Sequence, residues 1–425
     1  MFAALLLAEM GLQPIVLERG GDVDSRKQAV DTFWQTGKLD VESNVQFGEG
    51  GAGTFSDGKL TTRIKDPRCR KVLEEMVDAG APEEILYDAK PHIGTDLLRG
   101  VVKRLRKKII SLGGEVRFFA KVTGFQWEND RVQAVFLQNG EKIEAEDVVL
   151  ALGHSARDTF TLLYEEKFAL EQKPFAIGVR IEHRQDRISR AQLGEQWAAF
   201  PPVDYKLVCH LPTGRSAYTF CVCPGGQIVA AASQPGGLVT NGMSNRARDG
   251  AFINGGFLVG VSPGDFGSED PLAGAAFQAL WEEKAYAFGR PGYEAPAQRV
   301  GDFLAGRPSV GPGRVHPSYR PGVTWTDLRR CLPPFVADTI AGALPLLGQK
   351  LRGYDDPDAV LTAVESRSSS PVRIPRDGTC QSSLRGLYPC GEGAGYAGGI
   401  LSAAADGMHC AEQLCQSIQK ESDCL

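Results

Sequence analysis

The first twenty positions run from an apolar helical pattern through a glycine to a short apolar strand. Residues 2–10 are dominated by Ala, Leu, Glu and Met, which favour a helix, and Gly11 is typical of a helix end. Residues 14–17, Pro-Ile-Val-Leu, predict a short buried strand that ends at Glu18. Helix, glycine, buried strand and acidic residue together indicate the second half of a βαβ unit.

Further along, helical patterns give way to strand patterns. Residues 21–46 are mixed and polar, which predicts a loop or a short helix. Helices are expected at 72–79 and 94–112, followed by a run of strands with Asn139-Gly140 as a hairpin turn. The predicted strands cover residues 115–119, 122–127, 132–137, 142–145 and 147–152, and the last one ends at Gly153.

The middle of the chain differs from both ends. Residues 165–370 lack the strand–helix alternation and are rich in Pro, Gly and mixed strand patterns. The alternation returns with a strand at 386–390, a turn at 391–393 and a helix at 400–416. We therefore expect an α/β protein in which residues 1–164 and 371–425 form one discontinuous Rossmann-like domain. Residues 165–370 would form an inserted α+β substrate domain.

Charge and cysteine content exclude several functions. The formal net charge of −5 argues against nucleic-acid partners. The one dense basic run, at 103–108, follows a helical pattern and is expected on its solvated face. No apolar stretch reaches membrane-spanning length. The ten cysteines show no zinc spacing, which predicts no metal site and reduced thiols in a cytoplasmic compartment.

Glycine is the compositional outlier, with 50 residues gathered in short runs. The clearest runs are at 48–53 and 391–399, near opposite ends of the chain. Clustered glycine lets the backbone approach a ligand or another backbone segment closely. The alternative is a set of tight turns.

Glu18 closes the second strand of the predicted βαβ unit. A carboxylate at this position accepts hydrogen bonds from ribose hydroxyls. A 2′-phosphate prefers an arginine, so Glu18 favours FAD or NAD over NADP, although the neighbouring Arg19 leaves NADP open. A surface glutamate after a strand is the alternative.

Residues 47–60, FGEGGAGTFSDGKL, partly imitate a phosphate-binding P-loop. The Ser or Thr that binds Mg²⁺ should follow Lys59, and Leu60 stands there instead, which argues against an ATPase. We interpret the segment as a glycine-rich loop against a flavin or its pyrophosphate. Lys59 would place positive charge near the flavin N1–C2 edge or near phosphate. The candidate cofactor contacts in this loop are Gly50, Gly51, Ser56 and Asp57.

Two further segments carry candidate chemistry. In residues 150–158, LALGHSARD, a buried strand ends at Gly153, and His154 and Asp158 are candidates for proton transfer, with a structural histidine as the alternative. Residues 388–404, YPCGEGAGYAGGILSAA, are a strand, a glycine-rich turn and a helix of small residues. Free amides and the helix dipole at such a helix start suit an anionic group. Glu392 is placed to hold a ribityl hydroxyl.

Several segments, in this order along the chain, carry a resemblance to a known family. They are VLERG, FGEGGAGTFSDGKL, VVLALGHSARDTF, CVCPGG, NGMSNRARDG, ESRSSSPVRIPRD and GLYPCGEGAGYAGGILSAAADG. The combination resembles the uncharacterised FAD-dependent dehydrogenases of the glutathione-reductase-like flavoprotein superfamily, over nearly the whole chain. The resemblance implies a discontinuous FAD domain with an inserted second domain.

The resemblance also assigns positions to the cofactor. It implies that Glu18 binds the adenosine ribose, that Val122 meets the adenine through its backbone, and that Gly153 lines the pyrophosphate side. The ribityl chain and isoalloxazine would be held by Gly391, Glu392, Gly398, Gly399 and Ile400. Relatives place a strand and a G-x-G-x-x-G loop before the helix that opens this chain. The sequence is therefore expected to be a fragment, or to have a misassigned start, and to lack that strand and loop.

The sequence thus predicts an FAD-dependent oxidoreductase acting on a small molecule, with NAD(P)H as a candidate electron donor. Lys59, His154 and Arg248 are the candidate catalytic residues. Cys221 and Cys223 form a C-x-C pair that is either a redox dithiol or two structural cysteines. The alternatives are a non-catalytic flavin or nucleotide binder, an ATP-using enzyme at residues 53–59, and an RNA-modifying flavoenzyme. The substrate and oligomeric state stay open.

Overall fold

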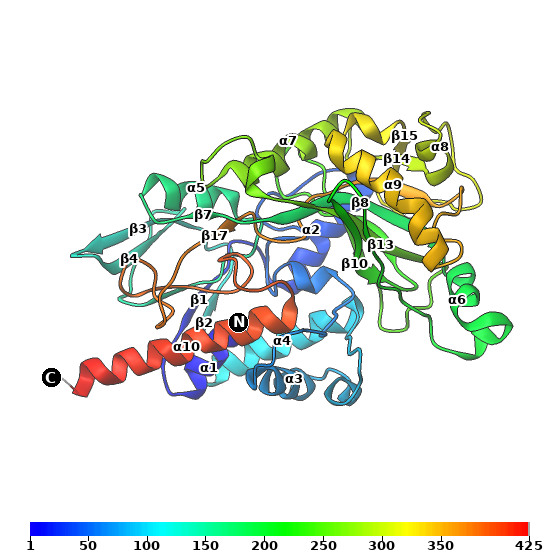
Figure 1. Ribbon diagram of the computed structural model, residues 1–425. Helices are drawn as coiled ribbons and strands as arrows, with labels where there is room; N and C mark the ends of the chain where they lie inside the picture. Colours follow the sequence, from blue (N-terminus) through cyan, green and yellow to red (C-terminus); the bar gives the residue numbers. More distant parts are fainter. Residues whose placement is uncertain (424–425) are drawn as a thin grey trace.

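The computed structural model describes residues 1–423 and has a helical half and a sheet-rich half (Figure 1). In the lower half of Figure 1 the N-terminal helix α1 (Phe2–Glu9) packs against the C-terminal helix α10 (Ile400–Asp423). The helices α3 (Arg68–Asp78) and α4 (Thr95–Ser111) complete this layer. A Cβ added to Gly407 of α10 would lie 3.7 Å from Ala3 of α1, so small residues allow the two helices to approach closely.

Two pairs of short parallel strands lie beside these helices. Strand β1 (Ile15–Leu17) pairs with β2 (Glu115–Arg117), and β18 (Leu387–Pro389) pairs with β6 (Val148–Leu150). Within residues 1–423 the two pairs form separate ladders. The chain therefore leaves β1 at Glu18, β6 at Gly153 and β18 at Gly391, and ligands of α/β proteins bind outside such carboxyl ends.

A three-stranded antiparallel sheet projects from this half, at the left of Figure 1. It consists of β3 (Val122–Glu128), β4 (Arg131–Leu137) and β5 (Lys142–Glu144). Gly140, with φ of 86°, turns the chain between β4 and β5, as the Asn-Gly signal predicted.

Helix α2 (Val23–Thr36) corrects the expectation of a loop or short helix at residues 21–46. Asp22 caps it by accepting hydrogen bonds from the amides of Asp24 and Ser25. Its buried face combines Val30 and Phe33 with a fully buried arginine, Arg26. An arginine at a core position breaks the apolar period, and for this reason the helix was not recognised in the sequence.

The guanidinium of Arg26 organises the glycine-rich loop that follows. It donates hydrogen bonds of 2.7–3.3 Å to four main-chain oxygens, those of Asn44, Val45, Gly48 and Glu49. Burial lowers the pKa of Arg26 to about 10, so the group remains charged at neutral pH. A Cβ on Gly48 would collide with the Arg26 side chain, which fixes glycine at this position.

A seven-stranded sheet dominates the upper half of Figure 1. Its order is β15-β14-β16-β8-β13-β10-β9, antiparallel except for the β14–β15 pair. Helices α7 (Ala273–Phe288) and α9 (Pro334–Lys350) cover its upper face. The strands are β8 (Phe175–Arg184), β9 (Val208–His210), β10 (Ser216–Cys223), β13 (Phe252–Val261), β14 (Ala295–Arg299), β15 (Val323–Trp325) and β16 (Val360–Glu365).

Smaller elements complete the fold. The remaining helices are α5 (Arg157–Glu165), α6 (Gln185–Leu193) and α8 (Val300–Leu304), and the remaining strands are β7 (Glu171–Gln172), β11 (Gln227–Ala230), β12 (Thr240–Met243) and β17 (Val372–Arg373). Strands β7 and β17 pair, so the chain enters and leaves the sheet-rich region at neighbouring points. The structure has the expected mixed α/β character; the exact domain boundaries stay predictions. None of the helices described is long and apolar enough to cross a membrane.

The role of Arg26 gives a first prediction. In Arg26→Met the four main-chain oxygens lose their donor inside the protein, and we expect the free energy of unfolding to fall by about 3 kcal/mol. Urea unfolding followed by circular dichroism measures this change. The control is Lys27→Met on the same helix, because its ammonium group is part exposed and pairs only with Asp31. It should change stability by less than about 0.5 kcal/mol. Equal losses in both variants would contradict the role of Arg26.

Candidate functional site

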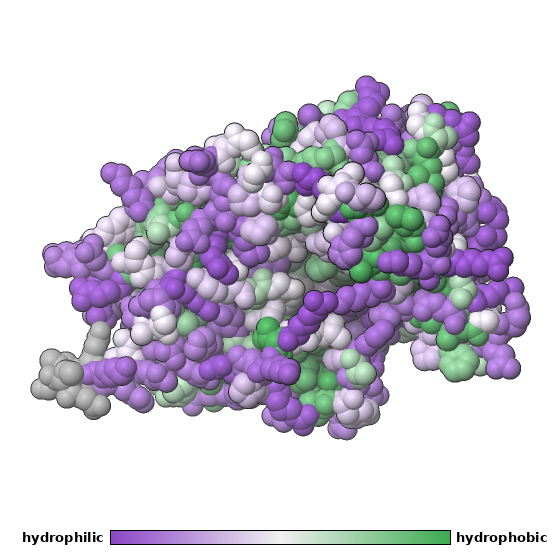
Figure 2. Space-filling view, viewed as in Figure 1, coloured by the Kyte–Doolittle hydropathy of each residue, from purple (hydrophilic) through white to green (hydrophobic). Residues whose placement is uncertain are grey.

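The two glycine-rich segments from opposite ends of the chain meet in the structure. A Cβ added to Gly53 would lie 2.9 Å from Cγ1 of Ile400, so the 48–58 loop contacts the start of α10. A Cβ added to Gly393 would lie 2.6 Å from the main-chain oxygen of Gly153. The loops after β6 and β18 are therefore in contact as well. In Figure 2 pale residues of weak hydropathy occupy the middle of the face between the two halves.

Glu18 ties the end of β1 to the glycine-rich loop. Its Oε1 atom accepts hydrogen bonds from the amides of Gly20, at 2.9 Å, and Gly48, at 3.0 Å. Both bonds use the same carboxylate oxygen. The amide of Ala120 donates to the main-chain oxygen of Glu18 at 2.9 Å. Val122, at the start of β3, follows Ala120 by two residues and therefore lies near Glu18.

Arg19 is engaged by carboxylates of the protein itself. It donates to both oxygens of Asp158, at 2.9 and 2.8 Å, and to Glu42 at 2.6 Å. Burial works against ionisation of Asp158, but Arg19 and Lys121 outweigh it and hold its pKa well below the usual range. Asp158 is thus a permanent anion at neutral pH and has no proton to donate. The geometry gives Arg19 a structural role beside Glu18.

The loop residues Ser56 and Asp57 differ in what they contact. Ser56 Oγ donates to the main-chain oxygen of Gly53 at 2.6 Å and accepts from the amide of Gly58 at 3.1 Å, which closes the turn. Asp57 is buried and accepts hydrogen bonds from Ser244 and from Arg248, whose Nε lies 3.1 Å away. The structure therefore brings together Asp57 and Arg248, which are far apart in sequence.

Arg248 lines an open cleft, and the charge of Lys59 acts on Asp204 of the same lining. The Nζ of Lys59 donates to the main-chain oxygen of Val222 on β10. The cleft has a volume of about 330 Å³, and Lys90, Asp204 and Arg248 contribute to its lining. Burial raises the pKa of Asp204, but the hydrogen bond from Lys90 and the charges of Lys59 and Arg248 lower it on balance. The cleft thus carries an excess of positive charge next to the 48–58 loop.

His154 lies on the opposite side of the glycine turns, against a buried ionic network that the sequence did not reveal. Arg157 and Arg367 both donate to Glu282 of α7. Burial, together with the charges of Arg367 and Arg157, lowers the pKa of His154 to about 4. Its imidazole is therefore neutral at pH 7 and cannot act as a general acid there. Its Nδ1 atom lies 2.9 Å from the Ser155 hydroxyl.

The turn before α10 is shaped for a ligand. The amide of Gly391 donates to Asp406 at 2.7 Å, which fixes the start of the turn. A Cβ added to Gly398 or Gly399 would meet nothing within 4 Å, and the same holds at Gly51 and Gly153. These glycines from three segments border open space around the contact between the loops. Glycine at these positions leaves room for a ligand to approach the backbone.

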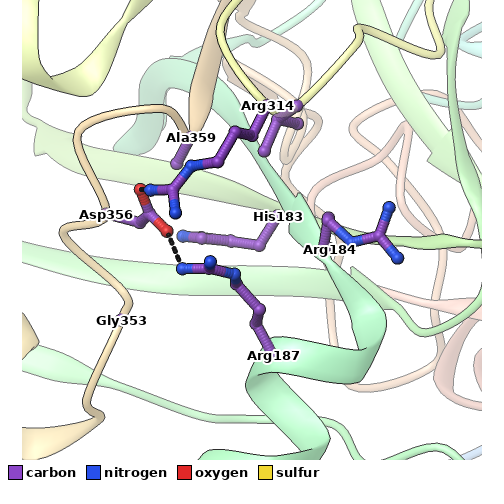
Figure 3. Close-up of a pocket in the computed structure, with 8 residues that line it drawn as sticks. His183, Arg184, Arg187, Arg314, Gly353, Asp356 and Ala359 are labelled. Atoms are coloured by element: carbon purple, nitrogen blue, oxygen red, sulfur yellow. Dashed lines mark hydrogen bonds and ion pairs between the residues drawn. The ribbon is translucent and has the colours of Figure 1, made fainter.

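A second, smaller cavity lies away from these loops (Figure 3). The carboxylate of Asp356 accepts hydrogen bonds there from Arg187, at 3.0 Å, and Arg314, at 3.2 Å, beside His183. Its volume of about 10 Å³ leaves room for at most one water molecule. The cavity is therefore no substrate site.

Glu392 yields a prediction on pH. Burial raises its pKa to about 7, although Lys173 opposes the shift. Its neutral form is thus favoured in the folded protein, and the stability it contributes is lost as the pH rises from about 4.5 to about 7. Glu392→Gln should match the wild type in stability at about pH 4, below both pKa values. At pH 8 it should be more stable by about 1 to 2 kcal/mol.

Urea unfolding of the flavin-free protein at both pH values measures this difference. Glu144→Gln is the control, since the Glu144 side chain is 84% exposed and should show no pH-dependent difference. A constant offset between the Glu392 variant and the wild type at both pH values would contradict a raised pKa.

Comparisons with known proteins bear on the family of the chain. The model of the family "FAD-dependent protein, C-terminal domain-like" matches residues 174–368. An uncharacterised protein of Clostridium beijerinckii is 49% identical over 421 residues, which cover 98% of this chain and 79% of that protein.

Solved flavoproteins also match nearly the whole chain, at low identity. L-proline dehydrogenase from P. horikoshii is 11% identical with a TM-score of 0.44, covering 98% of this chain and 90% of the other. Glycine oxidase from Bacillus cereus is 12% identical with a TM-score of 0.36, covering 98% and 92%. These scores are too low to carry an argument on function. The chain belongs to the same family as the Clostridium beijerinckii protein. Its residues 174–368 match a domain of FAD-dependent proteins, which indicates FAD as the cofactor.

Proposed function

We propose that this protein is an FAD-dependent oxidoreductase that acts on a small molecule in the cleft beside Lys59 and Arg248. The contact between the 48–58 loop and the start of α10 carries the proposal, because it joins the two glycine-rich segments next to that cleft. Bound FAD would supply two-electron transfer. The protein would supply the position of the substrate and the charges around it.

The residues present suit the parts of FAD in order. Glu18 would hold the ribose through its Oε2 atom, and Gly153 would allow the pyrophosphate to approach the backbone. Glu392 would hold a ribityl hydroxyl. The free amides at the start of α10, at Gly398, Gly399 and Ile400, would stabilise negative charge on a reduced flavin.

The charged residues near the cleft would have different roles in binding and catalysis. Asp57 fixes the orientation of the Arg248 guanidinium, which faces the cleft. Lys59 donates its hydrogen bond to a neutral main-chain carbonyl, that of Val222. We assign to Arg248 the binding of a polar or anionic substrate group. Lys59 would raise the electron affinity of the flavin. His154, neutral at pH 7, would serve as a hydrogen-bonding partner.

Flavin reduction tests the proposal directly. The purified protein should contain FAD, seen in its visible absorbance. Under anaerobic conditions NADH or NADPH should bleach that absorbance, and a quinone should restore it over repeated cycles. Arg248→Met should keep its FAD but turn over about 10 to 100 times more slowly, the loss expected for one charge-assisted contact. Arg215→Met is the control, because Arg215 pairs with Asp265 elsewhere. A protein with full FAD content that no donor reduces would be a flavin binder without catalysis.

The contact between Gly393 and Gly153 gives a prediction on cofactor binding. In Gly393→Ala the new methyl group would meet backbone atoms of Gly153 at 2.6 and 2.7 Å, and neither atom can move aside cheaply. The two loops must separate, and we expect FAD to bind at least about tenfold more weakly, or about 1.4 kcal/mol. Quenching of FAD fluorescence on titration measures the affinity. Gly378→Ala is the control, since its methyl group would meet nothing within 4 Å. Unchanged affinity in Gly393→Ala would exclude the tight contact.

A further inference from the structure

Cys221 and Cys223 lie at a kink in β10, beside the candidate active site. The pairing of β10 with β13 shifts register between Phe220 and Cys223, and Cys221 has a left-handed φ of 43°. A bulge of this kind re-aims a side chain and commonly occurs next to active sites. Cys221 is half-buried and Cys223 is fully buried. Cys221 is therefore the more exposed residue of the pair.

The spacing of the pair permits a disulfide. In a regular strand, residues two apart are separated by about 6.6 Å, near the upper limit of about 6.8 Å for disulfide Cα atoms. The register shift of β10 interrupts the regular strand at this pair. Cys223 Sγ donates to the main-chain oxygen of Cys221 at 3.4 Å, and the two thiols also share a hydrogen bond.

The surroundings of Cys221 favour its thiolate. The hydrogen bond from Cys223 lowers the pKa of Cys221, as do the charges of Arg180 and Lys59, although burial opposes them. The same hydrogen bond, together with burial, raises the pKa of Cys223. Arg180 is fully buried and donates to the main-chain oxygen of Cys221 at 2.8 Å. Six titratable groups interact through their charges with one or both thiols. They are Asp57, Lys59, Arg180, Tyr205, Glu365 and Glu392.

The pair lies between the cleft and the flavin turn. The charge of Cys221 contributes to the raised pKa of Glu392, which lies in the turn before α10. On the other side, Lys59 donates to Val222, the residue between the two cysteines. Asp57, whose charge also reaches Cys221, binds Arg248 of the cleft lining. A position among charged groups of the candidate active site favours a redox role over a purely structural one.

We propose that Cys221 and Cys223 are a redox-active dithiol that reduces a small disulfide entering the cleft. The Cys221 thiolate attacks one sulfur of the substrate, forming a mixed disulfide and releasing the first thiolate. Cys223 then loses its proton to that leaving thiolate and attacks Sγ of Cys221. The products are the Cys221–Cys223 disulfide and two substrate thiols, so two electrons pass from the pair to the substrate. The proposal deepens the proposed function and rests on it only for re-reduction of the pair.

Release of thiopyridone from dithiodipyridine tests the exchange on the flavin-containing protein. The background is Cys69→Ser with Cys424→Ser, because Cys69 is half-buried and Cys424 lies outside the described residues. At about pH 6 the intact pair should release two equivalents, about tenfold faster than an ordinary thiol. Mass spectrometry should then find a Cys221–Cys223 disulfide. Cys223→Ser should release one equivalent and retain a pyridyl adduct on Cys221. Cys221→Ser should lose the fast phase.

The proposal fails if Cys221→Ser keeps the fast release, or if the intact protein accumulates an unresolved adduct. Circular dichroism and FAD content show whether the variants fold. If Cys221→Ser does not fold, iodoacetamide labelling of the intact protein at pH 6 decides, and Cys221 should be the first thiol modified. Preferential labelling of another cysteine would overturn the proposal. These readouts do not depend on flavin turnover, so normal reduction by NAD(P)H without exchange would leave the proposed function standing.

Discussion

The buried guanidinium of Arg26 is the constraint on which the site depends. Four main-chain oxygens between residues 44 and 49 converge on it, and a loop that contains several glycines would otherwise have many conformations. With the loop held, the amide of Gly48 meets Glu18, and Gly53 reaches Ile400 of the C-terminal helix. One cation therefore fixes both the ribose side and the isoalloxazine side of the proposed flavin site.

The other arginines around the site are mostly neutralised by carboxylates. Arg19 pairs with Asp158 and Glu42, Arg376 with Asp406, and Arg180 with Glu365. Buried charges require such partners, because an unpaired one costs several kcal/mol. Among the ion pairs of residues 1–423 none involves Lys59, whose ammonium group binds a carbonyl. Lys59 thus differs from these arginines in having a neutral partner, next to the two cysteines.

The sequence predicted those features whose signals are local. The helix at the N-terminus, the Asn139-Gly140 turn and the helix after the final glycine run were all confirmed. The meeting of the two glycine-rich segments was also predicted, because their order resembled one family. The ionic networks were not predictable, since partners such as Arg157 and Glu282 lie 125 residues apart. Helix α2 was missed because Arg26 takes a place in its buried face that an apolar residue would normally hold.

The sheet-rich half contributes to the site through an irregularity in β10, which lies next to the edge strand β9. A regular β10 would alternate its side chains between the helix-covered face and the opposite face. The register shift before Cys223 breaks this alternation, and Arg180 on β8, two strands away in the same sheet, donates to the carbonyl of Cys221. Contacts from Lys59 to Val222 and from Asp57 to Arg248 then cross from the helical half to the sheet. The two halves therefore meet through functional groups as well as through apolar packing, and a shift of one against the other would change the charge around Cys221.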